Sequence, residues 1–470
     1  MQRTLTADIG KQEGKKVILM GWVGARRDHG KIIFIDLRDK SGLAQCVFTA
    51  KEKVLFSQAD ELRSEWVVKI TGKVNKRPKD LINTELKSGK WEVLVENLEV
   101  LNKAETPPIA VDTDGREIGE ESRLRYRYLD LRRPRMQKNM RSRHAINKLI
   151  RDYLSDQEFI EIETPIISKS TPEGARDFLV PSRIYPGKFY ALPQAPQQYK
   201  QLLMVAGLEK YFQIARCFRD EDTRGDRQPE FTQLDLEMSF VEKEDVMGVI
   251  EGLFIEMVEK LFPHKKLTKK PFPRLKYADV IKKYKTDSPD LRKNKDDKDE
   301  LAFAWVTNFP FFEKTKEDKW TFTHNPFSAP LKEHEQWLME EKNIGKIITN
   351  QYDLVLNGQE VAGGSIRSHN PKVLKKVLQI IGVKNDQIKS NFGHMLAALG
   401  FGAPPHGGIA AGIDRLVAIL NDEPNIREVI AFPKTGDARD LMMDAPSEAS
   451  KEQLDELGLS IRHSERSEES

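Results

Sequence analysis

Short apolar runs separated by glycine-containing turns fill the chain from residue 15 to residue 101. Stretches such as KVILMGWV, KIIFIDLR and WVVKITG are rich in β-branched and aromatic residues, which is typical of strands. Several strands of this length within one short segment predict a small closed barrel of the OB type. A different small β-sandwich is the alternative that this pattern leaves open.

The character of the chain changes after this segment. KAETPPIAVD contains prolines and predicts a linker. Beyond it, apolar residues recur at the i, i+3, i+4 and i+7 spacing of an amphipathic helix, at Ile146, Leu149, Ile150 and Tyr153. Strands then alternate with helices to about residue 445, which predicts an α+β domain.

These patterns divide the chain into four parts. We expect a barrel over 1–104, a linker over 105–135, an α+β domain over 136–461 and a tail over 462–470. The tail has no apolar residue and is expected to be disordered. The Lys- and Asp-rich stretch 264–300 predicts surface structure and a loop.

A charged loop leads into an alternating strand in CFRDEDTRGDRQPEFTQLDLEMSF, residues 217–240. One strand face is apolar and carries Leu234, Leu236, Met238 and Phe240. The other face carries Phe231, Gln233, Asp235, Glu237 and Ser239. The preceding YFQIARCFRDE also alternates, so the two strands predict a hairpin whose polar face offers Arg219 and Glu221 as well. Arginine suits a phosphate and phenylalanine suits an adenine ring, but a solvated face with a salt-bridged turn is the plainer alternative.

Two further segments carry candidate chemistry. GGIAAGIDRLVAIL is a glycine-rich strand that enters a helix at Arg415; it has no P-loop signature. In QYDLVLNGQEVAGGSIRS, Asp353 and Glu360 are carboxylates of the kind that Mg²⁺ uses beside a triphosphate. An ordinary hairpin with surface charges would look the same.

Composition narrows the classes of protein. The 470 residues have a net charge of only +3, so nucleic-acid binding would need local basic patches. The two cysteines, Cys46 and Cys217, are far apart, which argues against a disulfide framework and fits a reducing compartment. The N-terminus lacks the apolar core of a signal peptide and no apolar run could span a bilayer. We therefore expect a cytoplasmic protein with no membrane partner.

Taken together, the motifs resemble those of class II aminoacyl-tRNA synthetases of the bacterial aspartyl type, from about residue 3 to residue 461. FIEIETPIISKSTPEGARDF resembles the first class motif, the 217–240 hairpin the second, and GIAAGIDRL the third. LPQAPQQYKQLLM and EVAGGSIRSHN resemble the aspartate-specific segments. The resemblance implies an OB-type anticodon-binding barrel followed by a catalytic domain built on an antiparallel sheet flanked by helices. It also implies a homodimer with Pro165 at the interface.

The resemblance assigns roles around ATP. Arg219 would hold the α-phosphate, Phe231 would stack on adenine and Arg415 would take the γ-phosphate. Glu221 would lie by the nucleotide or the tRNA acceptor end, and Glu237 on the ATP side. Asp353 and Glu360 would hold Mg²⁺. The catalytic set is therefore Arg219, Glu221 and Arg415.

The resemblance also assigns a site for L-aspartate. Lys200 and Arg367 would bind its side-chain carboxylate, which a neutral asparagine could not satisfy. Its ammonium group would meet Glu173, Gln197, Gln233 and Asp235. His324 would belong to a flexible segment that closes over the substrate; the family's second histidine is replaced here by Asn325.

On the barrel, the residues expected to contact tRNA are Arg26, His29, Phe34, Gln45 and Glu92; the GARRD segment also supplies Arg27 and Asp28, and a core role for Phe34 is the alternative. His29 lies where relaxed members, which charge both tRNA-Asp and tRNA-Asn, tend to have histidine. Asp80 stands where such members usually have glycine. We expect a relaxed enzyme, and a strictly tRNA-Asp-specific enzyme is the alternative.

The expected activity is ATP-dependent formation of aspartyl-adenylate, followed by transfer of the aspartyl group to tRNA. Two alternative hypotheses are a paralogue that activates an amino acid without charging tRNA, and an OB-type nucleic-acid binder with a decayed catalytic domain. The stretch between Phe240 and Arg427 is too short for the extra domain that bacterial members usually insert there, so we expect that domain to be absent.

Overall fold

The computed structural model describes residues 2–170 and 174–461. The chain separates into two compact units, Met1–Arg133 and Pro134–Ser470. The expected tail 462–470 and Glu173 lie outside the described residues. Within the described part of the chain, no helix combines the length and the apolarity that crossing a membrane requires.

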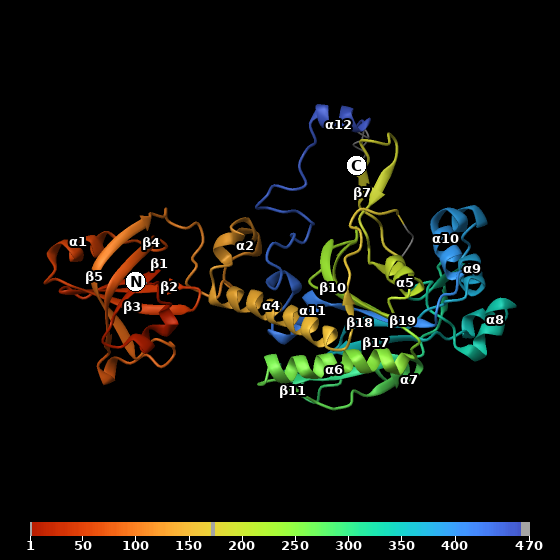
Figure 1. The fold of residues 1–470 in the computed structure, drawn as a ribbon, viewed down its shortest axis with the longest axis horizontal. Coiled ribbons are helices and arrows are strands. Elements are labelled where there is room, and N and C mark those ends of the chain that lie inside the picture. The colour runs from red at the N-terminus through yellow and green to blue at the C-terminus, as the bar shows by residue number, and fades with distance from the viewer. Residues whose placement is uncertain (1, 171–173, 462–470) are drawn as a thin grey trace, which may run out of the picture. The chain divides into compact units, whose positions relative to one another are not determined.

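The first unit contains a closed barrel with the strand order β1-β2-β3-β5-β4 (Figure 1). Its inward positions alternate with outward ones: Ile33, Ile35 and Leu37 are fully buried, while the residues between them are partly exposed. All neighbouring strands are antiparallel except β3 and β5. The predicted OB-type barrel is therefore confirmed. Its elements are β1 Lys16–Asp28, β2 Ile32–Asp39, β3 Gly42–Thr49, α1 Lys53–Glu61, β4 Val67–Lys76 and β5 Trp91–Asn102, followed by α2 Glu120–Arg125 and α3 Arg127–Asp130.

The second unit is built on an eight-stranded sheet with the order β12-β14-β17-β18-β19-β10-β9-β6. Its central strands are antiparallel, and only the edge pairs β12–β14 and β6–β9 are parallel. The predicted fold class, an antiparallel sheet flanked by helices, is confirmed. The strands are β6 Ile160–Glu161, β9 Lys210–Phe218, β10 Glu230–Ser239, β12 Arg274–Lys276, β14 Phe303–Thr307, β17 Gln351–Leu356, β18 Gln359–Ile366 and β19 His406–Gly412.

One face of this sheet packs against α4 Pro134–Ser155, α6 Lys243–Leu261 and α11 Ile413–Leu420 (Figure 1). Leu234, Leu236 and Met238 of β10 belong to this apolar core. Their neighbours Gln233, Asp235 and Glu237 therefore point to the opposite face. The remaining elements are α5 Gln197–Val205, α7 Tyr277–Tyr284, α8 Glu335–Met339, α9 Pro371–Ile380, α10 Asn385–Leu399, α12 Lys451–Leu457 and the small pairs β7 Leu179–Pro181 with β8 Phe189–Ala191, β11 Lys266–Leu267 with β13 Glu300–Leu301, and β15 Phe312–Lys314 with β16 Trp320–Phe322.

Two expectations from the pattern differ from the structure. Phe240 does not continue the apolar face of β10: the strand ends at Ser239, and Phe240 has a positive φ of 59° and is 69% exposed. The stretch 264–300 is also more than a surface loop, because it supplies the edge strand β12 and helix α7. Phe272 anchors this stretch by stacking on Phe303 with ring centroids 4.6 Å apart, a tertiary contact that local composition does not reveal.

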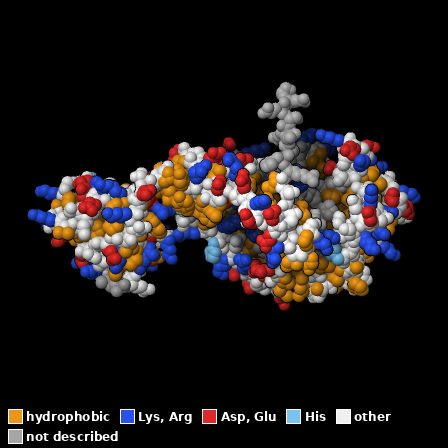
Figure 2. Space-filling model, turned by 90° about the horizontal axis from the view of Figure 1, so that it is seen from above, with side chains coloured by type: hydrophobic (Ala, Val, Ile, Leu, Met, Phe, Trp, Pro, Cys, Tyr) orange, Lys and Arg blue, Asp and Glu red, His pale blue; other side chains and the backbone are white. Residues whose placement is uncertain are grey.

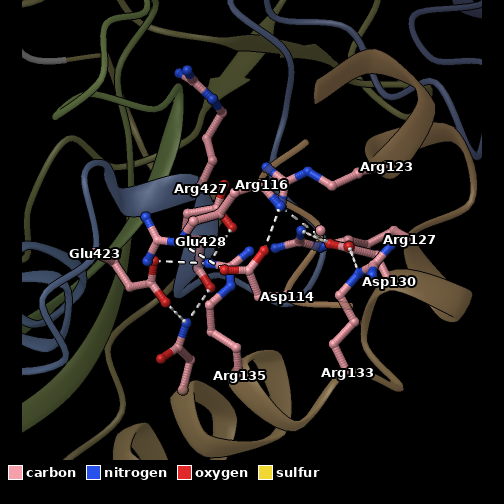
Figure 3. A network of polar contacts seen from close by, with 12 residues as sticks. Asp114, Arg116, Arg123, Arg127, Asp130, Arg133, Arg135, Glu423, Arg427 and Glu428 are labelled. Carbon is pink, nitrogen blue, oxygen red and sulfur yellow. Dashed lines mark hydrogen bonds and ion pairs between the residues drawn. The ribbon is translucent and has the colours of Figure 1, made fainter. Parts of the chain in front are cut away.

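Buried ion pairs brace both units internally (Figure 3). In the first unit, Asp130 accepts hydrogen bonds from Arg127 and Arg133, each at 2.7 Å. In the second unit, Arg135 donates to Glu423 at 2.8 Å and to Glu428 at 3.0 Å, which ties the start of α4 to the segment after α11. On the face drawn in Figure 2, basic and acidic side chains are interspersed in each unit. This agrees with the small net charge of the chain.

Candidate active site and nucleic-acid interface

The polar face of β10 forms the floor of the site. Its Asp235 lies opposite Ala410 of β19 and Gln213 of β9, and Glu237 lies opposite Gly408. A Cβ atom at Gly408 would collide with the Glu237 carboxylate and with the backbone carbonyl of Leu236. The glycine-rich composition of β19 therefore leaves room for acidic side chains on the neighbouring strand.

Asp414 at the start of α11 holds this floor in place. Its carboxylate accepts a hydrogen bond from the backbone N–H of Thr232 at 2.8 Å and another from Arg143 of α4. One buried carboxylate thus ties together a helix, a central strand and the helix that carries Arg415. The sequence pattern did not single out Asp414 or Arg143.

A cavity of about 600 Å³ opens above the floor. It brings together residues predicted from all of the separate motifs: Gln197, Lys200, Arg219, Glu221, Phe231, Gln233, Asp235, His324, Glu360, Arg367 and Arg415. Asp353 is buried beside the cavity and is not among its lining residues. The expected role of Glu173 cannot be followed here, since that residue lies outside the described part of the chain.

Four buried charged residues in the cavity wall form a row of ion pairs, called the ladder below: Asp235, Lys200, Glu237 and Arg367. Lys200 Nζ lies 2.8 Å from Asp235 Oδ2 and 3.3 Å from Glu237 Oε2. Arg367 Nε lies 2.9 Å from Glu237 Oε1. Glu237, which the resemblance placed on the ATP side, is thus the carboxylate shared by the two cations expected to bind the aspartate side chain. Its second bond to Arg367, from Nη2 at 3.3 Å, makes the contact two-pronged.

The two carboxylates of this ladder differ electrostatically. Burial raises the pKa of Asp235, and the neighbouring Lys200 offsets only part of that effect. Burial also acts to raise the pKa of Glu237, but Arg367 and Lys200 together outweigh it and hold the pKa below its usual value. Asp235 Oδ1 is buried without a hydrogen-bond partner. The ladder therefore keeps one acceptor for a cationic ligand group.

Arginines line the other end of the cavity. The Arg219 guanidinium lies over the Phe231 ring, 5.0 Å from its centroid, and its Nε atom is buried without a partner. Arg415 donates to the backbone carbonyl of Glu360 and lies 3.2 Å from Asp226. Asp226, in the loop between β9 and β10, was not among the predicted site residues. Both guanidiniums retain N–H groups that could donate hydrogen bonds to a polyphosphate.

The carboxylates of Asp353 and Glu360 lie close together at the edge of the cavity. A Cβ atom on Gly363 would lie 3.0 Å from Glu360 Oε1 and 3.1 Å from Asp353 Oδ1, so the two carboxylates meet above this glycine. Burial and the charge of Glu360 raise the pKa of Asp353 well above its usual value. Among the described residues no three acidic, His or Cys side chains gather as a metal cluster. Two carboxylates fit a Mg²⁺ ion that completes its shell with phosphate oxygens and water.

His324 lies beside this carboxylate pair. Its Nδ1 atom is 4.0 Å from Asp353 Oδ2, and its ring meets Phe309 edge-on with centroids 4.7 Å apart. Burial lowers the pKa of His324, which favours the neutral ring. Asn325, which replaces the family's second histidine, accepts a hydrogen bond from the backbone N–H of Phe327 at 3.0 Å and so stabilises the local turn.

On the barrel, the predicted tRNA-contacting residues come from several elements: Arg26 from β1, His29 from the loop after it, Phe34 from β2, Gln45 from β3 and Glu92 from β5. Phe34 is partly exposed, which excludes the alternative that it belongs to the core. The His29 ring meets Phe34 edge-on with centroids 5.5 Å apart. Gln45 donates to Glu92 at 2.9 Å. These four side chains therefore share one face.

Arg26 does not join this face. It pairs with Asp60 of α1 at 2.6 Å. Its neighbour Arg27 lies opposite Phe34 in the β1–β2 pairing and grips Asp36 with two bonds of 2.5 and 2.8 Å. Strand alternation puts adjacent residues on opposite faces, and the cross-strand register places Arg27, not Arg26, beside Phe34.

Comparison with known proteins agrees with this geometry. Residues 119–436 match the family described as tRNA synthetases class II (D, K and N), and residues 17–101 match the OB-fold nucleic acid binding domain. The chain belongs to the class II tRNA synthetases of this D, K and N group. The predicted resemblance to aspartyl-tRNA synthetases is confirmed by curated relatives. An Aspartate--tRNA(Asp/Asn) ligase of Rubrobacter xylanophilus is 43% identical and covers 95% of each chain, and one of Desulfatibacillum aliphaticivorans is 40% identical and covers 98% of each.

The alignment with the Rubrobacter relative spans 573 positions, more than the 470 residues of this chain. The relative therefore has residues that this chain lacks, in keeping with the expected absence of an inserted domain. Among solved structures, the asparaginyl-tRNA synthetase of Pyrococcus horikoshii has a TM-score of 0.75 at 24% identity, covering 93% of this chain and 98% of that one. A putative aspartyl-tRNA synthetase from Leishmania major also has a TM-score of 0.75, at 21% identity and with 92% and 94% coverage. At these identities the structures establish the fold alone.

Proposed function

We propose that the protein is an aspartate–tRNA ligase that activates L-aspartate with ATP and transfers it to the 3′ end of tRNA. The observation that carries the proposal is the buried pair of cations, Lys200 and Arg367, in the wall of a cavity that also holds arginines for a polyphosphate. A carboxylate side chain can bind beside these cations. An asparagine amide carries no negative charge to interact with these cations, so the site would favour aspartate.

The neighbouring acceptors orient the rest of the amino acid. Asp235 Oδ1, buried without a partner, suits the substrate ammonium group, and so does the amide oxygen of Gln197. Gln233 has its Oε1 atom within 3.3 Å of the Cys217 thiol, which donates to it. The Gln233 NH₂ group is therefore better suited to the substrate α-carboxylate than to the ammonium group that we had expected.

The first step forms a bond between a carboxylate oxygen of aspartate and the α-phosphorus of ATP, and the bond to pyrophosphate breaks. Arg219 would stabilise the charge on the α-phosphate and Arg415 the charge on the leaving group. In the second step the terminal ribose hydroxyl of tRNA attacks the activated carbonyl, loses its proton and releases AMP. No protein nucleophile is needed, because positioning and electrostatics supply the rate.

Asp353 and Glu360 would hold the Mg²⁺ ion that accompanies ATP. Such an ion neutralises phosphate charge. The raised pKa of Asp353 fits a carboxylate whose negative charge is stable only beside a cation.

The test is aspartate-dependent exchange of labelled pyrophosphate into ATP, without tRNA. Arg367→Leu should raise the KM for aspartate steeply and leave the KM for ATP nearly unchanged. Arg292→Leu is the matched control, because Arg292 forms a comparable pair with Asp290 outside the cavity. Equal losses for both substrates would show that Arg367 acts only on the fold.

We further propose that the barrel face reads the anticodon and that the enzyme charges both tRNA-Asp and tRNA-Asn. His29 is exposed and lies against Phe34, so its imidazole can donate to or accept from either pyrimidine at the third anticodon position. The two relatives above carry names that include both tRNAs. The measurement is aspartylation of tRNA-Asn beside tRNA-Asp and an unrelated tRNA. Charging of tRNA-Asn at the level of the unrelated tRNA would refute the relaxed specificity. If His29→Leu charges tRNA-Asn as well as the wild type does, His29 is not the cause of the relaxed specificity.

Dimerisation and a cytoplasmic location complete the proposal. Large apolar side chains are exposed around Pro165 and on the β7–β8 hairpin: Ile160, Ile166, Ile167, Leu179 and Phe189. Exposed apolar side chains in such number suit an interface between two copies. Sedimentation should give twice the mass of one chain, and Ile167→Glu should shift it toward the monomer.

A further inference from the structure

A histidine at the start of β19 has both ring nitrogens engaged. His406 is fully buried. Its Nδ1 atom lies 2.7 Å from the carbonyl oxygen of Pro404. A carbonyl only accepts hydrogen bonds, so Nδ1 carries a proton. In the neutral ring Nε2 is then an acceptor, and it lies 2.9 Å from Gln201 Nε2, which must donate to it.

The donor-to-acceptor direction of these hydrogen bonds continues along α5. Gln201 is fully buried, and because its NH₂ group faces His406, its carbonyl oxygen faces the other way. That oxygen lies 3.0 Å from Gln197 Nε2, one helical turn earlier. The Gln197 NH₂ group is therefore used inside the protein. Gln197 lines the cavity, and no group in the described part of the chain donates to its Oε1 atom.

We propose that His406 and Gln201 form a positioning relay that fixes the amide of Gln197, so that Gln197 offers an oxygen rather than an NH₂ group to the ammonium group of the amino-acid substrate. This rests on the proposed function, since it concerns the same aspartate site. The carbonyl of Pro404 sets the direction of every donor in the relay. An amide free to rotate would present its NH₂ group to an ammonium ion part of the time, and two donors repel each other.

The relay also has a defined response to pH. The charged or titratable groups near His406 are Glu237 on β10, with Arg367 and His369 after β18. Burial lowers the pKa of His406 even though Glu237 opposes the effect, so the ring is neutral near pH 7. As the pH falls through that pKa, Nε2 gains a proton and becomes a donor. Gln201 and then Gln197 must reverse, and Gln197 turns its NH₂ group toward the substrate.

The experiment measures aspartate and ATP kinetics by pyrophosphate exchange for two variants of Gln201. Gln201→Met removes the relay at similar volume and frees the Gln197 amide to rotate, so the KM for aspartate should rise about two- to tenfold, the usual net cost of losing one neutral hydrogen bond. The KM for ATP should stay within about twofold. Gln201→Glu keeps an oxygen for the Gln197 NH₂ group, so its KM for aspartate should return close to that of the wild type. Gln336→Met on α8 is the control, because Gln336 donates to Glu340 at the same i, i+4 spacing on an exposed helix.

The outcomes separate this inference from the proposed function. If the wild type shows no aspartate-dependent exchange, the proposed function is wrong. If the wild type is active and Gln201→Met leaves the KM for aspartate unchanged, the relay is refuted. An equal loss in Gln201→Met and Gln201→Glu, or an equal rise in the KM for ATP, would likewise overturn it by showing a merely structural role. In the wild type the KM for aspartate should rise on acidification, and Gln201→Met should lose this dependence.

Discussion

The sheet of the second unit and the barrel of the first both contain a strand with one apolar and one polar face, but the two polar faces differ in their exposure to solvent. In both units an antiparallel strand turns one face to an apolar core and the other to a ligand. On β10 the acidic part of the polar face is buried: Asp235 and Glu237 are fully buried and already paired with Lys200 and Arg367. On β2 the polar face is partly exposed, and Phe34 and Asp36 meet solvent as well as their neighbours.

The difference follows from what each face must bind. A small charged substrate is recognised by a few groups in a low dielectric, so the site must hold its charges ready and compensated. A nucleotide loop is bound over a wide surface by stacking and modest hydrogen bonds. A substitution should therefore cost far more in the cavity than on the barrel.

The largest expected contrast is in stability. Lys200→Met leaves Asp235 and part of Glu237 buried without a positive partner, and should lower the free energy of unfolding by about 3–5 kcal/mol. Arg27→Met breaks the pair with Asp36 on the barrel and should cost at most about 1 kcal/mol, because that pair is screened by water. Guanidinium unfolding followed by circular dichroism measures both. If the two variants lose similar amounts of unfolding free energy, the proposed difference between the cavity and the barrel is wrong.

The next effect is on catalysis. Arg219→Ala removes a guanidinium expected at the α-phosphate and should lower kcat/KM for pyrophosphate exchange by the equivalent of about 2–5 kcal/mol. Arg216, three residues earlier on β9, forms a partly exposed pair with Glu230, and Arg216→Ala is the matched control. Near-normal exchange by Arg219→Ala would mean that the phosphate site lies elsewhere.

A smaller effect is expected on the barrel. Phe34→Ala should lower kcat/KM for tRNA by the equivalent of about 1–3 kcal/mol, because one stacking surface is lost. Pyrophosphate exchange without tRNA should be unaffected, which separates the two units functionally. Val54→Ala on the exposed side of α1 serves as the control. A loss of exchange in Phe34→Ala would contradict the division of labour.

The smallest effect concerns Asp353 in the absence of Mg²⁺. Burial and Glu360 raise the pKa of Asp353, so the folded protein resists its ionisation. Stability should therefore fall as the pH rises from the unfolded pKa of the carboxyl group, near 4, through the raised folded pKa. Asp353→Asn should flatten this dependence and be more stable than the wild type at neutral pH, while losing Mg²⁺-dependent exchange. The test is thermal unfolding of both proteins at several pH values. If Asp353→Asn is less stable than the wild type at neutral pH, the ionised Asp353 does not destabilise the fold.

Particular residues show how far pattern reasoning reached. The alternation of Leu234, Leu236 and Met238 predicted β10 and its polar face, because a strand places alternate residues on opposite sides. The same reasoning failed at the next alternating position, Phe240, which has a positive φ and lies beyond the end of the strand. The sequence offered both Arg26 and Arg27, and which of them lies beside Phe34 depends on the register between β1 and β2, which cannot be read from one strand alone.

The sequence by itself determined many of the strands and helices, because periodicity is a local property of the chain. It also determined the two kinds of domain and, through the motifs that resemble the family, eleven of the side chains that line the cavity. Only the tertiary structure decided which charges share a partner. Glu237 lies between Lys200 and Arg367, Asp414 joins Thr232 to Arg143, and His406 reaches Gln201, each across a long stretch of sequence. These pairings depend on which strands and helices become neighbours when the core is buried. The need to satisfy every buried charge and donor then selects the partners.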